Sequence, residues 1–163
     1  MKKNAGFTLV EVLIYAGLSS VLIGLFAGIL ITSTRIQGQQ SASTTLTGEI
    51  NFLLATIKQK IGDSTNIVFT DDDDITLTTN TYPSFPTRIF LEDGLIKLTE
   101  NNQPATPLST TKIVIDSLMF VDLSVASSQA VQIQITASSN TTNPQNAATR
   151  SVQTTASPLI QAQ

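Results

Sequence analysis

The sequence opens on a long apolar segment, "MKKNAGFTLVEVLIYAGLSSVLIGLFAGIL" at residues 1–30, which contains one acid, Glu11. Between Phe7 and Ile31 this acid is the only charged residue, and there is no proline. As a helix the segment would extend about 37 Å, more than the roughly 30 Å hydrocarbon core of a bilayer. Lys2 and Lys3 precede it, so the positive-inside rule predicts a cytoplasmic N-terminus and an extracytoplasmic remainder.

Three interpretations of this segment compete. A cleaved secretory signal would have an apolar core of about 7–15 residues and a small-x-small cleavage site. This run is longer, and no clear site follows Ile31. A plain signal anchor explains the length and the lysines but leaves Glu11 unexplained. A carboxylate inside a span costs several kcal/mol unless it is paired, so Glu11 is a functional candidate. Alternatively, its side chain extends to the lipid headgroups, because it lies only about one turn inside the span.

The third interpretation rests on the motif "GFTLVEVLI" at residues 6–14, which follows a short basic leader. This pattern resembles the class III signal of type IV pilins and type II secretion pseudopilins. The resemblance implies that a membrane aspartyl protease, prepilin peptidase, cleaves after Gly6 and methylates the new N-terminal amine of Phe7. It implies a structural subunit that is an enzyme's substrate, not an enzyme. The other implied partners are pilin or pseudopilin subunits and an inner-membrane assembly platform.

The same resemblance supplies a counter-charge for Glu11. The free amine of Phe7 would face this carboxylate, on the same chain or on a neighbouring subunit, and each charge would offset the burial of the other. Such a pair should set assembly register more than the stability of one chain. Small residues also recur at every fourth position, on one helical face, which lets helices approach closely, although such residues are common in membrane helices. They are Ala16, Ser20, Gly24 and Gly28.

Beyond Ile31 the sequence becomes polar, and an amphipathic pattern then begins. Its apolar residues recur at spacings of four, three, four and four positions, which define one helical face. They are Leu46, Ile50, Leu53, Ile57 and Ile61. Gly62 and Asp63 predict the end of the helix. We therefore expect one long helix from about Phe7 to Ile61, with a loosening near Gly38 as an option.

The rest of the chain is strand-like. Its short segments are rich in β-branched residues and partly alternate in polarity. They are "NIVFT", "ITLTT", "TRIFLE", "LIKLT", "KIVIDSLMFVDLSV", "AVQIQITA" and "RSVQTTA", and "EDGL" at residues 92–95 predicts a hairpin. One long helix packed on an antiparallel sheet is an α+β, pilin-like fold. The expected organisation is a leader at 1–6, a transmembrane or filament-core helix at 7–31, its amphipathic continuation at 32–62 and a β-rich head at 63–163.

Composition excludes several function classes. The chain has 163 residues, with 9 basic and 12 acidic side chains, so it offers no basic field for nucleic acid. It contains neither histidine nor cysteine. Serine or cysteine triads with histidine are therefore impossible, and most zinc sites are disfavoured. We expect no catalytic residues and no cofactor.

Three features of the head are weaker candidates. The run Asp71, Asp72, Asp73 and Asp74 offers oxygen ligands for a hard cation, but it lacks the spaced ligands and glycine of a calcium loop, which favours a solvated, self-repelling turn. Tyr82, Phe85 and Phe90 offer aromatic surface, with packing as the more ordinary role. Asn140 begins a short glycosylation-like sequon that carries little weight.

The predicted function is a structural subunit of a type IV pilus or of a type II secretion-like filament. The order of elements is similar to that of minor pilins and J- or W-type minor pseudopilins. The chain would be a single-pass membrane protein with a cytoplasmic N-terminus, and would then enter an extracellular or periplasmic filament. The rival from another class is a membrane-anchored extracytoplasmic binding or adhesion module that never polymerises. Such a module would keep its leader and tolerate the loss of Glu11.

Overall fold

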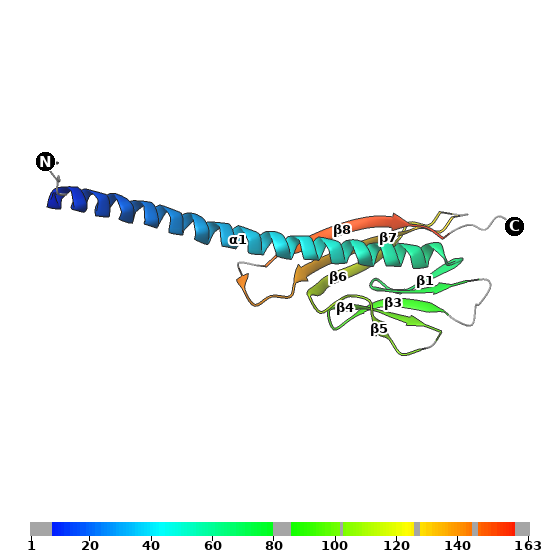
Figure 1. The fold of residues 1–163 in the computed structure, drawn as a ribbon. Coiled ribbons are helices and arrows are strands. Elements are labelled where there is room, and N and C mark those ends of the chain that lie inside the picture. Colours follow the sequence, from blue (N-terminus) through cyan, green and yellow to red (C-terminus); the bar gives the residue numbers. More distant parts are fainter. Residues whose placement is uncertain (1–7, 80–85, 102, 126–127, 145–146, 159–163) are drawn as a thin grey trace. The chain divides into compact units, whose positions relative to one another are not determined.

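The computed structural model describes residues 8–79, 86–101, 103–125, 128–144 and 147–158. The chain divides into two compact units, Met1–Gly38 and Gln39–Gln163. One helix, eight strands and their connections make up the described residues (Figure 1). The predicted α+β, pilin-like fold class is confirmed, because a long N-terminal helix accompanies sheets in which every strand pairing is antiparallel.

The helix α1 runs from Leu9 to Gly62, close to the predicted limits, and it remains helical through Gly38. It ends as the Gly-Asp pair predicts. The Ser64 amide and hydroxyl both donate to the carbonyl oxygen of Ile61, at 3.1 and 2.7 Å. Ser64 is buried, so these bonds satisfy a carbonyl that the helix end would otherwise leave unpaired.

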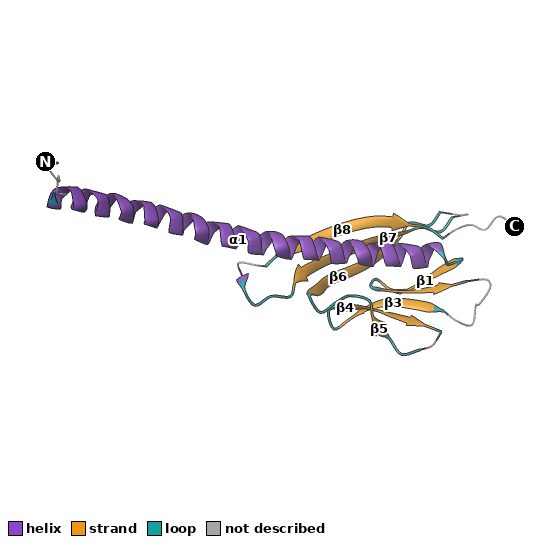
Figure 2. Ribbon diagram, in the orientation of Figure 1, coloured by secondary structure: helices purple, strands orange, loops and turns teal. Residues whose placement is uncertain are grey.

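The strands of the second unit divide into two sheets, where a single sheet was expected. The first sheet has five strands in sequential order. They are β1 (Asn66–Asp71), β2 (Asp74–Thr78), β3 (Thr87–Glu92), β4 (Leu95–Glu100) and β5 (Thr106–Pro107). The second has three strands in sequential order, β6 (Ile113–Asp122), β7 (Val131–Ser139) and β8 (Thr149–Ala156). Figure 2 shows the second half of α1 beside these strands.

The core of the second unit forms where the amphipathic stripe of α1 meets the inward residues of both sheets. All five predicted stripe residues are at most 1 % exposed, and Leu54 widens the stripe. The main strand residues that complete the core are Ile75, Leu77, Ile89, Ile96, Ile113, Ile115, Leu118, Phe120, Val131, Ile133 and Ile135. Burying each of these side chains fully contributes about 1.5–3 kcal/mol, which explains why the stripe residues need the sheets.

Two connections join the sheets at hairpin turns. The amide of Ile115 donates to the carbonyl of Gly94 at 2.9 Å, and the amide of Phe120 donates to the carbonyl of Asp72 at 2.7 Å. Asp93 and Gly94 both have positive φ, 54° and 71°, the geometry of the two-residue turn that "EDGL" predicts. β6 is therefore the strand that ties the second sheet to the first.

Candidate processing and assembly site in the N-terminal helix

The predicted cleavage and methylation site, Gly6 and Phe7, lies outside the described residues. The described chain begins at Thr8, whose side chain caps α1. Its Oγ1 accepts from the Glu11 amide at 3.3 Å, and its carbonyl accepts from the same amide at 3.1 Å. Thr8 and Glu11 occupy the N-cap and N3 positions of the T-x-x-E pattern that opens many helices.

This cap is a role of the motif that sequence reasoning missed, although "TLVE" at residues 8–11 carries the signal. Glu11 is exposed and lies in the first turn of α1, where the helix dipole favours a negative charge. The interaction of Glu11 with the helix dipole therefore stabilises the start of α1 without any neighbouring subunit. The Phe7 amine proposed as its partner belongs to the residues that the structure does not describe.

The first part of α1 is apolar on every side, and none of the described residues of its own unit covers it. Every described residue from Thr8 to Gln37 is exposed. Among the largest apolar side chains, Leu9 is 78 % exposed and Ile23 is 69 % exposed. The helix is long and apolar enough to cross a membrane, and none of its apolar window is buried. Such a surface is stable only when lipid or other apolar helices surround it.

The predicted small-residue stripe lies on this exposed helix. The Ser20 hydroxyl donates to the carbonyl of Gly17 at 2.9 Å, so it is satisfied without a partner helix. A Cβ atom added at Gly24 or Gly28 would meet nothing within 4 Å. These two glycines line a shallow groove of ≈ 510 Å³ together with Leu25, Ile29, Thr32, Ser33 and Ile36. The groove gives a neighbouring helix room for close approach.

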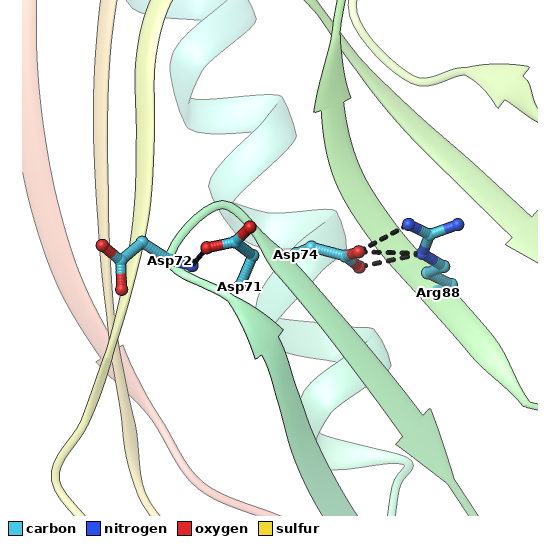
Figure 3. A network of polar contacts seen from close by, with 4 residues as sticks. All are labelled: Asp71, Asp72, Asp74 and Arg88. Carbon is cyan, nitrogen blue, oxygen red and sulfur yellow. Dashed lines mark hydrogen bonds and ion pairs between the residues drawn. The ribbon is translucent and has the colours of Figure 1, made fainter.

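The aspartate run forms a turn in which Asp71 and Asp72 are exposed, as its charge predicted, but Asp74 is buried rather than solvated. Asp71 and Asp74 pair across the β1–β2 hairpin, with Asp72 and Asp73 as its turn. Asp74 is 5 % exposed, and the Arg88 guanidinium binds its carboxylate with Nη2 at 2.6 Å and Nε at 3.0 Å (Figure 3). This ion pair offsets the charge that would otherwise force the turn open.

Asp72 and Asp74 also point in different directions (Figure 3). Figure 3 shows Asp72 on the opposite side of the turn from the Asp74–Arg88 pair. The hydrogen bonds and the ion pair of Asp74 raise the pKa of Arg88 above its ordinary value. Among the described residues, no group of three or more acidic side chains is arranged to hold a metal ion.

The remaining candidates show no common site. Tyr82 and Phe85 lie outside the described residues. Phe90 is half-buried and its ring lies 4.6 Å from the Arg88 guanidinium, so it supports the Asp74–Arg88 pair through a cation–π contact. Asn140 is exposed, and its side-chain amide donates to the Thr111 carbonyl at 2.9 Å.

Comparison with known proteins identifies the N-terminal segment alone. Residues 1–27 match the family described as the prokaryotic N-terminal methylation motif, which is the signal of type IV pilins and pseudopilins. No curated protein and no solved structure matches the chain. The motif points to a processed, membrane-anchored structural subunit of the pilin or pseudopilin kind, handled by prepilin peptidase and assembled with other pilin subunits.

Proposed function

We propose that this chain is a subunit of a type IV pilus or of a type II secretion-like filament, assembled through its N-terminal helix. One observation carries the proposal. The methylation motif at residues 1–27 overlaps the first part of α1, where every described residue from Thr8 to Gln37 is exposed, so this end of the chain needs apolar partners. The order of elements supports a minor pilin or a J- or W-type minor pseudopilin.

In this proposal, processing defines the N-terminus of the mature subunit. Prepilin peptidase cleaves between Gly6 and Phe7 and methylates the Phe7 amine. The leader carries Lys2 and Lys3, which keep it in the cytoplasm, while the head lies outside the membrane. Cleavage removes both lysines and creates a positive amine four positions before Glu11.

The new amine and Glu11 then serve as an assembly pair. In the membrane both charges leave water, and each is costly unless the other is near. An inner-membrane assembly platform would extract the helix into a bundle where the amine of one subunit meets a Glu11 carboxylate, its own or a neighbour's. The groove at Gly24 and Gly28 supports close packing of these helices.

The assembly role of Glu11 is tested by Glu11→Val in a strain that makes the filaments. We expect membrane insertion and head folding to be unchanged, because Glu11 lies in the first unit and the core of the head is built within the second. Incorporation into sheared filaments should fall about tenfold or more, which corresponds to a loss of about 1.4 kcal/mol in the free energy of assembly. Immunoblots of sheared and membrane fractions measure both amounts.

Glu49→Val is the matched control, because Glu49 lies on the same helix but within the second unit. It should leave incorporation near the wild-type amount. Equal incorporation of the Glu11→Val and wild-type chains would contradict the pairing role. A wild-type chain that stays in the membrane and never enters filaments would instead favour the non-polymerising anchored module.

A further inference from the structure

A groove of ≈ 480 Å³ lies between β1 and β6, each of which is an edge strand of its own sheet. One of its ends is closed where the amide of Phe120 donates to the carbonyl of Asp72 at 2.7 Å. Near the start of β1, the Gln129 side chain accepts from the Ile67 amide at 3.0 Å and donates to the Asn66 side chain. Between these connections the two strands do not pair with each other.

Both walls direct backbone groups into the groove. The Ile67 amide points away from β2 and donates to Gln129. Backbone amides two residues apart on a strand point in the same direction, so the Phe69 amide also points away from β2. The Phe120 amide points away from β7 to reach Asp72, so the Asp122 backbone shares that direction. Among the described residues, none hydrogen-bonds the Phe69 amide across this edge. An unpaired strand edge accepts an extended chain.

The lining of the groove combines an apolar surface with uncompensated negative charge. Its apolar side chains include Phe69, Met119 and Val121. Its acids are Asp71, Asp72 and Asp122, and no lysine or arginine of the described residues lines it. The hydroxyl and amide of Ser124 donate to the Asp122 carboxylate and hold the pKa of that group below its ordinary value, so it stays charged.

We propose that this groove docks an extended segment of a partner protein that carries lysine or arginine beside apolar side chains. Backbone groups of the segment would pair with the β1 and β6 edges and bridge the two sheets. Its basic residues would face Asp72 and Asp122, and its apolar residues would cover Met119 and the neighbouring apolar lining. This interaction is separate from assembly through the N-terminal helix, because every lining residue lies in the second unit.

The test uses the full chain in zwitterionic detergent micelles and two fluorescent peptides. One peptide alternates lysine and valine, and the other alternates glutamate and valine. Fluorescence anisotropy measures binding, with empty micelles as the background. We expect the lysine peptide to bind at least about tenfold more tightly than the glutamate peptide, with an affinity that falls as salt rises. Equal binding of the two peptides would overturn the proposal.

Asp72→Asn with Asp122→Asn removes two charges of the groove while keeping the size of both side chains. This double variant should bind the lysine peptide about fivefold more weakly than the wild type. The matched control is Asp93→Asn with Asp116→Asn, two exposed acids outside the groove that give the same change in net charge. A control that weakens binding as much as the groove variant would show that net charge alone attracts the peptide.

Hydrogen exchange locates the bound segment. Saturation with the lysine peptide should slow exchange of the Phe69 and Asp122 amides, which point into the groove. The amide of Ile135, buried inside the second sheet, should be unchanged. Protection elsewhere, with Phe69 and Asp122 unaffected, would contradict docking along these two edges.

Discussion

The two units treat apolar side chains in opposite ways, although they share one helix. In the first unit, the apolar side chains of α1 lie on all sides of the helix and are exposed. In the second unit, apolar residues of the same helix form one stripe that is at most 1 % exposed at Leu46, Ile50, Leu53, Ile57 and Ile61. A stripe needs one covering surface, which the sheets provide, whereas an all-round apolar helix needs lipid or other helices.

The largest contrast should come from matched truncations in the two units. Ile57→Ala removes a side chain that is 0 % exposed and should lower the free energy of unfolding by about 2–5 kcal/mol. Ile23→Ala removes one that is 69 % exposed and should change it by less than about 0.5 kcal/mol. Denaturant titration of the full chain in detergent measures both. Similar losses in the two variants would contradict the division into covered and uncovered apolar residues.

A smaller loss of unfolding free energy is expected when the buried carboxylate of the second unit, Asp74, is replaced. Asp74→Ala leaves the Arg88 guanidinium over Phe90 without its carboxylate and should cost about 1–3 kcal/mol of unfolding free energy. Asp74→Asn keeps an oxygen acceptor and should cost less than the alanine variant. The same titration measures the two, and an alanine variant as stable as the wild type would mean that the ion pair is dispensable.

The smallest effect on the head should follow a change in the first unit. Gly28→Leu adds a side chain where a Cβ meets nothing within 4 Å, so unfolding of the head should be unchanged. Its incorporation into filaments should fall several-fold, because the groove at Gly24 and Gly28 is filled. Gly17→Leu, equally open but off the stripe, is the control. Equal incorporation of the two variants would show that the small-residue stripe is not part of the assembly surface.

Much of the fold could be predicted from local patterns. The spacing of Leu46 to Ile61 predicted the buried face of α1, and short β-branched, partly alternating segments located every strand of the two sheets except the two-residue β5. "EDGL" identified a turn whose two central residues both have positive φ. These features depend on neighbours within a few positions, which periodicity and turn chemistry report directly.

Features that join distant segments could not be predicted. Asp74 is buried because Arg88, on another strand, reaches it, and a run of four aspartates gives no sign of that partner. The division into two sheets, and the groove between β1 and β6, depend on tertiary contacts such as Phe120 with Asp72. The capping role of Thr8 is different, since its T-x-x-E signal was present in the sequence.

The most direct test of the proposed function is the mass of the N-terminus with and without prepilin peptidase. The full chain is expressed in both backgrounds, purified from membranes and analysed by mass spectrometry. With the peptidase, we expect a chain that begins at Phe7 and carries one added methyl group, and without it a chain that keeps its leader. A chain that keeps residues 1–6 in the presence of the active peptidase would contradict the account.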